Sequence, residues 1–176
     1  MMPHSTIRRL AVAAAVTATV SVGAAAAADP KVLGSFKDWN AFSFEESGNT
    51  VCYASSQPKR KEPAAAKRGD IYVLITHRPA EKTFDVVSFM MGYPLKKGVD
   101  AAVTIDGKAY SLFTDGESAW ARDTETDRAL VQAMKAGRSM TIKGTSQRGT
   151  TTTDTYSLSG VSDAYEAMGT ACNVKR

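Results

Sequence analysis

Two Asp-Gly pairs near the middle of the chain, Asp106-Gly107 and Asp115-Gly116, constrain the fold more than any other feature of the sequence. An Asp-Gly pair populates the positive φ angles that a two-residue type I′ hairpin turn requires. The first pair joins Ala101–Ile105 to Lys108–Phe113, and such a turn places the apolar residues of both segments on one face. The second pair turns the chain back into Glu117–Arg122. The sequence therefore predicts a three-stranded antiparallel meander.

Further strands are expected on both sides of this meander. β-Branched and aromatic residues, in part with an alternating pattern, predict strands over these ranges: Thr50–Ser56, Asp70–Arg78, Phe84–Met91, Arg138–Ser146 and Thr151–Leu158. Both faces of the segment Ile71–Ile75 are apolar, so we expect this strand to be central and covered along most of its length.

Little helix is indicated. Asp123 or Thr124 is expected to cap a short helix, and Gly137 lies where a helix of that length would end. A last amphipathic turn or two begins near Val161. Many short strands with close turns predict a mainly β, antiparallel sandwich or barrel with one or two short helices. We expect residues 29–176 to form one such domain.

The first 28 residues have the pattern of a secretory signal peptide. Arg8 and Arg9 precede the uncharged run Leu10–Ala28, which ends in an A-x-A cleavage signal. We expect cleavage between Ala28 and Asp29. The alternative is an uncleaved anchor, but the run is mostly alanine and only weakly apolar for a permanent span. The mature protein is therefore expected in the periplasm, attached to the outer membrane or secreted, without a transmembrane segment.

Composition excludes several classes of function. The net charge is +4, and Arg8 and Arg9 of the leader carry half of it, which is too little to indicate nucleic acid as a partner. Two histidines and two cysteines are too few for a multi-histidine or four-cysteine metal site. The sequence has no nucleophile elbow, phosphate-binding loop or dinucleotide motif. We predict no catalytic residue, no metal and no cofactor.

The predicted export bears on whether the two cysteines are bonded to each other. Cys52 and Cys172 form an even pair in an oxidising compartment, where one structural disulfide is the default expectation. The alternative is a redox-active pair, but the sequence lacks the C-x-x-C spacing that such pairs use.

A cluster of cations lies in the segment Pro58–Arg68, which we expect to be an exposed loop. One interpretation is a surface patch for anionic lipid, lipopolysaccharide or sulfated glycan. The plainer interpretation, a solvated loop, is favoured because Glu62 interrupts the run and no aromatic residue is interleaved. The cations of this candidate patch are Lys59, Arg60, Lys61, Lys67 and Arg68.

Two other features have weaker functional interpretations. Arg68-Gly69-Asp70 spells a tripeptide that some cell-surface receptors recognise, but its last two residues are expected to form a turn before a strand. His77 shares a strand face with apolar residues and is expected to be a partly buried structural histidine. The alternative is a pocket near His77 or Trp120 that binds a small ligand or substrate.

A set of short segments between residues 38 and 172 carries a resemblance to a known family: Asp38-Trp39, Val51-Cys52-Tyr53, Met91–Lys96, Ala119-Trp120, Leu130–Met134, Lys143–Gly149, Thr153–Leu158 and the cysteine near the C-terminus. With these segments the chain resembles the invasion-associated locus B family of exported bacterial proteins. The resemblance implies a periplasmic or envelope-associated domain with an immunoglobulin-like β-sandwich. Some members are associated with invasion of host cells. The resemblance supplies no catalytic residue.

Two functions from different classes remain. The first is a non-enzymatic envelope protein that binds an unidentified macromolecule of the envelope or of a host. The second is a small-ligand-binding or enzymatic periplasmic protein with the pocket named above. A structural or stress-related periplasmic role fits the same features as the first.

Overall fold

The computed structural model describes residues 29–64 and 66–174. Within these ranges the chain forms eleven β-strands, two α-helices and a 3₁₀ turn at Pro79–Glu81. The strands are β1 (Lys31–Phe36), β2 (Trp39–Glu46), β3 (Asn49–Ser56), β4 (Arg60–Glu62), β5 (Tyr72–Arg78), β6 (Thr83–Met90), β7 (Ala101–Ile105), β8 (Lys108–Asp115), β9 (Ser118–Trp120), β10 (Ser139–Thr145) and β11 (Thr151–Ser157); the helices are α1 (Thr124–Ala136) and α2 (Val161–Ala171).

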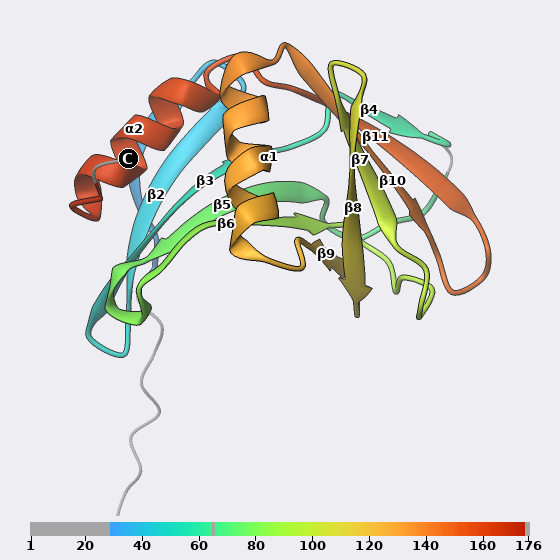
Figure 1. Cartoon of the computed structure of the whole chain (residues 1–176), viewed down its shortest axis with the longest axis horizontal. Helices are drawn as coiled ribbons and strands as arrows, with labels where there is room; N and C mark the ends of the chain where they lie inside the picture. The colour runs from blue at the N-terminus through green and yellow to red at the C-terminus, as the bar shows by residue number, and fades with distance from the viewer. Residues whose placement is uncertain (1–28, 65, 175–176) are drawn as a thin grey trace, which may run out of the picture.

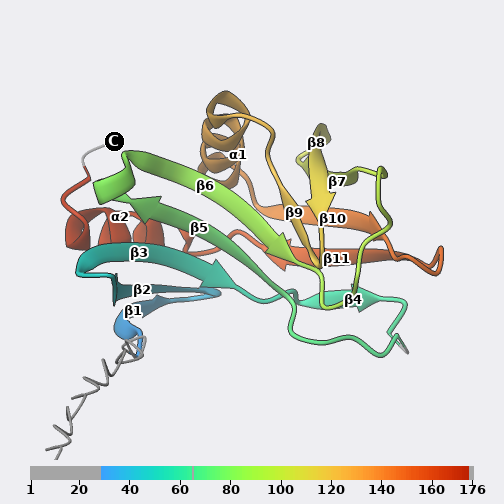
Figure 2. The same ribbon diagram turned by 90° about the horizontal axis from the view of Figure 1, so that it is seen from below.

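These strands form one antiparallel sheet in the order β1-β2-β3-β5-β6-β9-β8-β7-β10-β11-β4. The sheet does not close, so β1 and β4 are its two edges. Figure 1 shows the arrangement of the strands, and both edge strands are labelled in Figure 2. The expectation of a mainly β, antiparallel fold with one or two short helices is confirmed. The two layers of the sandwich are two halves of this single sheet, which changes direction at β8 and β9.

The meander has the predicted register. Ile105 pairs with Lys108, and Ala101 pairs with Leu112. Asp106 and Gly107 have φ angles of 46° and 84°, as a type I′ turn requires. The apolar side chains of β7 and β8 are buried on one face because the turn fixes which residues lie opposite each other.

Both helices cover the same face of the β1–β6 half of the sheet, with α1 on β6 and α2 on β1, β2 and β3 (Figure 2). Asp123 caps α1 by accepting a hydrogen bond from the backbone N–H of Thr126 at 2.7 Å. Gly137 ends this helix in an extended conformation, not the left-handed one. Its glycine identity follows from close packing, since an added Cβ would lie 2.8 Å from the side chain of Ile105.

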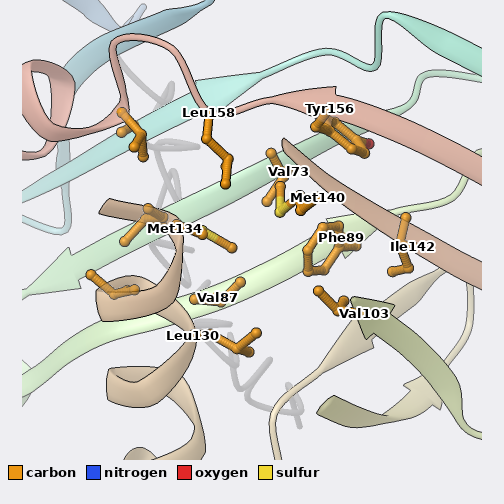
Figure 3. Packing of buried hydrophobic residues seen from close by; sticks show 14 of the residues in the cluster. Val73, Val87, Phe89, Val103, Leu130, Met134, Met140, Ile142, Tyr156 and Leu158 are labelled. Carbon is orange, nitrogen blue, oxygen red and sulfur yellow. The ribbon is translucent and has the colours of Figure 1, made fainter. Parts of the chain in front are cut away.

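The core lies between the two halves of the sheet and beneath the helices. In Figure 3 Phe89 and Val73 from one half face Met140 and Tyr156 from the other, while Leu130 reaches the same cluster from α1. The rings of Phe89 and Tyr156 are 6.1 Å apart in an edge-to-face arrangement. All of these side chains are buried, so the sheet halves and the helices share one continuous core.

A disulfide joins Cys52 on β3 to Cys172 at the end of α2, with a Cα–Cα distance of 6.1 Å. The predicted pairing is therefore present, and it closes a loop across a sequence separation of 120. The other end of α2 is fixed by Gly160, which has a φ of 93°. An added Cβ there would lie 1.9 Å from the carbonyl oxygen of Phe36, so only glycine lets the helix start so close to β1.

Candidate binding surfaces

The face of the sheet opposite the helices carries a cluster of large side chains. Buried residues alternate with half-buried ones along β5, at 39–42 of β2 and at 52–56 of β3, and the half-buried residues of these stretches point away from the helices. We call this cluster the aromatic face: Phe42, Phe44, Tyr53, Tyr72 and Leu74. The sequence interpretation that β5 is covered on both sides is wrong for Tyr72 and Leu74, because in the described residues no helix packs on that side.

The aromatic face contains two adjoining cavities. One of about 590 Å³ lies over Phe42 and the other, of about 420 Å³, lies over Phe44. Both are lined by Tyr53 and Leu74, so together they form a groove across three strands. The Tyr53 ring stacks on Phe42 at 4.9 Å and meets the edge of Phe44 at 6.0 Å, and burial raises the pKa of the Tyr53 hydroxyl. Lys59 and Arg78 lie at the rim.

The candidate basic patch is not a continuous surface. Arg60, Lys61 and Glu62 form the edge strand β4, which pairs with β11, so this part of the expected loop is a strand. The ammonium group of Lys59 pairs with Asp38, and the Arg60 guanidinium lies 3.8 Å from Glu62. These carboxylates offset the positive charge, as the interrupted sequence pattern suggested.

The prediction that Arg68 belongs to the basic patch is wrong, because its side chain is not at the surface. Its side chain is 4% exposed and forms a two-pronged ion pair, 2.6 Å and 2.6 Å long, with the fully buried Asp154. Its Nε and Nη2 groups also donate to the carbonyl oxygen of Met91. The tripeptide Arg68-Gly69-Asp70 is therefore not displayed for a receptor. Gly69 instead donates its backbone N–H to the carbonyl oxygen of Gly92 at 2.8 Å.

A second cavity region, of about 640 Å³, lies beside this ion pair. We call it the basic cavity. Its lining brings together three cations and several hydroxyl groups: Lys67, Arg68, Arg148, Tyr93, Ser146 and Thr152. The Arg68 guanidinium lies over the Tyr93 ring at 5.0 Å, and the Tyr93 and Thr152 hydroxyl groups are 2.6 Å apart. Burial raises the pKa of the Tyr93 phenol above its usual value.

His77 is fully buried and belongs to a polar cluster that joins β5, β6 and α2. Its Nδ1 accepts the backbone N–H of Asp85 at 3.1 Å, and its ring meets the Tyr165 ring edge-on at 5.4 Å. The Tyr165 hydroxyl donates to the Asp85 carboxylate at 2.5 Å. These contacts match the expected structural histidine.

The alternative, a pocket near His77 or Trp120, concerns two separate places, because the two side chains lie on opposite faces of the sheet. His77 is paired with Cys52, whose side chain points toward α2. Trp120 is paired with Ser88, which is paired with Leu74 of the aromatic face. Directly paired residues share a face, so the sheet separates the two candidates.

Asp127 is a buried acid, although the sequence indicated no role for it beyond the first turn of a helix. One of its oxygens accepts the backbone N–H of Val87 at 2.8 Å, which ties α1 to β6. Burial, together with the neighbouring carboxylates Asp85 and Asp123, raises the pKa of Asp127 to about 6, although the hydrogen bond from Val87 opposes the shift.

Sequence reasoning missed the aromatic face and most of the basic cavity. Phe42 and Phe44 alternate with smaller residues, a pattern that predicts a strand with large side chains on one face and small ones on the other. No local signal connects Arg68 with Asp154 or Arg148, because these residues meet only in the folded chain.

No helix in the described part of the chain is long and apolar enough to cross a membrane. The leader and its last residue, Ala28, lie outside the described residues, and Asp29 is the first residue within them. Cleavage between them stays a prediction.

Fold and surfaces together define a disulfide-linked, mainly β protein whose open sheet is covered by helices on one face. The chain belongs to the invasion-associated locus B family, since the model of that family matches residues 39–169. A similar solved structure is the crystal structure of invasion associated protein B from Bartonella henselae, at 14% identity and a TM-score of 0.56. The match covers 80% of this chain and 96% of that one, and it shows a shared fold. No curated protein matches the chain.

Proposed function

We propose that this protein is a non-enzymatic component of the bacterial cell envelope that binds another protein through the aromatic face. The observation that carries the proposal is the groove of half-buried aromatic side chains on the helix-free face of the sheet. Protein interfaces are enriched in such side chains at their centre and are polar at their rim. Lys59 and Arg78 supply a charged rim here.

Two observations support a binding role without catalysis. His77, the one histidine of the described residues, is fully buried and held by structural contacts. In the described residues no group of three or more His, Cys, Asp or Glu side chains is arranged to hold a metal ion.

The location and process are part of the same proposal. We propose that residues 1–28 direct export and are removed before Asp29, which leaves the mature protein in the periplasm. Mass spectrometry of a periplasmic fraction should then give a mature chain that begins at Asp29. A chain that keeps its leader, or that stays in the cytosol, would contradict export.

Invasion of host cells is the process in which we propose that the protein acts. The support is the family to which the chain belongs and the name of the Bartonella henselae protein whose fold it shares. A strain without the protein should yield fewer intracellular bacteria in a gentamicin-protection assay, and the gene supplied in trans should restore them. Equal counts with and without the protein would refute this role.

Crosslinking from the groove in intact cells tests the binding proposal. Phe44 is replaced with the photoreactive residue p-benzoylphenylalanine, and a matched variant carries the same residue at Arg128. Arg128 is exposed on α1, which covers the other face of the sheet. We expect an adduct of defined mass from position 44 that contains one envelope or host protein, and none from position 128.

Three outcomes would overturn the proposal. The first is the absence of an adduct from position 44. The second is the same adduct from position 128. The third is an adduct of twice the mass of the chain, because it would show self-association in place of a distinct partner. A Phe42→Ala change combined with the position-44 probe should reduce the adduct, because Phe42 lines the same groove.

A further inference from the structure

We propose that the basic cavity is a second binding site, distinct from the aromatic face, for an acidic saccharide: a sugar that carries a carboxylate, sulfate or phosphate group. The two sites share no lining residue. The cavity of about 640 Å³ is within the size range of small-ligand pockets.

The charge of the lining favours an anion. Asp154 offsets the charge of Arg68, which leaves Lys67 and Arg148 as the two exposed cations of the lining. No carboxylate lines the cavity, and among the described residues neither Lys67 nor Arg148 forms an ion pair. Two cations beside a partly enclosed space attract an anionic group more strongly than they would on an open surface.

Buried hydrogen-bond donors remain available at the same place. Tyr93 and Thr152 carry two hydroxyl protons but share one hydrogen bond, so one of these protons has no acceptor among the described residues. Arg68 has five N–H donors, and four of them are used on Met91 and Asp154. Buried donors favour a ligand that is rich in acceptor oxygens.

The hydroxyl groups favour a sugar over a bare anion. Hydroxyl side chains both donate and accept, and a ligand with several hydroxyl groups of its own can satisfy both roles. Phosphate or sulfate alone would occupy only part of the cavity. A sugar ring with one acidic substituent matches both the cations and the hydroxyl groups of the lining.

The site is also rigid, which lowers the entropic cost of binding. Arg68 is fixed by its ion pair, and the backbone N–H of Gly69 donates to the carbonyl oxygen of Gly92 at 2.8 Å. This hydrogen bond holds the segment of Arg68 against the segment of Tyr93. The backbone N–H of Gln147 donates to the carbonyl oxygen of Pro94 at 3.0 Å, so the segment before Arg148 is tied to the same place.

Isothermal titration calorimetry on the mature protein tests the proposal with three probes. Trigalacturonate carries the acidic groups, maltotriose is a neutral sugar of the same length, and inorganic phosphate is the anion alone. We expect saturable binding of trigalacturonate that weakens as salt increases, and much weaker binding of the other two. The double variant K67A/R148A should bind trigalacturonate about tenfold more weakly. The matched control R128A, with an exposed arginine changed outside the cavity, should bind as the unchanged protein does.

Each contrary result overturns a defined part of the proposal. Absence of saturable binding by trigalacturonate removes the site. Equal binding of maltotriose removes the role of charge, and equal binding of phosphate removes the role of the sugar. Equal weakening by R128A and K67A/R148A shows attraction by the whole protein, not by this cavity. Lys67 and Arg148 are exposed, so unchanged thermal unfolding should show that the double variant still folds.

Discussion

Replacing Asp154 with asparagine should destabilise the protein far more than breaking an ion pair of the same length at the surface. The oxygens of Asp154 lie 2.6 Å from the Arg68 guanidinium, and the side chains are 0% and 4% exposed. Asp154→Asn leaves the Arg68 charge buried without its counter-ion, and the expected loss is about 3–5 kcal/mol of the free energy of unfolding. Arg68→Met should cost a similar amount, because it leaves the Asp154 charge buried and removes two donors from Met91.

A matched control exists in the same molecule. Arg122 and Asp100 also lie 2.6 Å apart, but their side chains are 59% and 39% exposed. Asp100→Asn should therefore cost no more than about 1 kcal/mol. The shortest separations are equal, but Arg122 reaches Asp100 through one nitrogen and Arg68 reaches Asp154 through two, so the difference between the two substitutions reports burial together with the second hydrogen bond.

Urea unfolding followed by circular dichroism at pH 7 gives the free energies by linear extrapolation. The double variant R68M/D154L should lose much less than the sum of the two single losses, because it buries neither charge alone. A loss below about 1 kcal/mol for Asp154→Asn would refute the reasoning, since that is the value of an exposed pair. Additive losses in the double variant would refute it as well.

The remaining predictions concern the disulfide, a buried acid and a glycine. Removal of the disulfide by Cys52→Ala with Cys172→Ala should cost up to about 5 kcal/mol and lower the melting temperature by up to about 10–20 °C, because the bond closes a long loop. A fall of less than about 2 °C by calorimetry would contradict this. Between pH 4 and pH 6 the folded state keeps a proton on Asp127 that the unfolded state has lost, so this group makes the fold less stable as pH rises through that window. Asp127→Asn should remove that loss of stability, which is on the order of 2–3 kcal/mol. The amide oxygen of the asparagine still accepts the backbone N–H of Val87. Equal pH dependence of urea unfolding in both proteins would refute the raised pKa of Asp127. Gly160→Ala should reduce the melting temperature measurably, because the added Cβ would clash with a backbone carbonyl. Gly107→Ala is the control: its Cβ would have no atom within 4 Å, so this substitution measures the cost of a positive φ alone.

Local chemistry accounts for the parts of the fold that the sequence predicted. The Asp106-Gly107 turn is specified by two adjacent residues, and the paired strands follow from it in register. The Asp123 cap likewise depends on residues within one helical turn. Such features are visible in a single sequence because the interacting groups are neighbours along the chain.

The parts that could not be predicted depend on contacts between distant segments. Arg68 looked like one cation of a surface run, but its partner Asp154 is 86 residues away along the chain. Leu74 looked like a core residue because both faces of its strand are apolar, and only the placement of the helices decides which face is covered. The sequence named His77 and Trp120 together as the surroundings of an alternative pocket, and only the strand pairing shows that they lie on opposite faces.

The free edges of the sheet have a consequence for how the protein meets other molecules. The edge strand β4 consists of three exposed charged residues, Arg60, Lys61 and Glu62. A neighbouring strand could hydrogen-bond to this margin only by desolvating those charges, which opposes polymerisation. The other margin, β1, has an irregular register between Val32 and Gly34, which interrupts the ladder that an incoming strand would extend. Copies of the chain are thereby discouraged from joining edge to edge into fibrils.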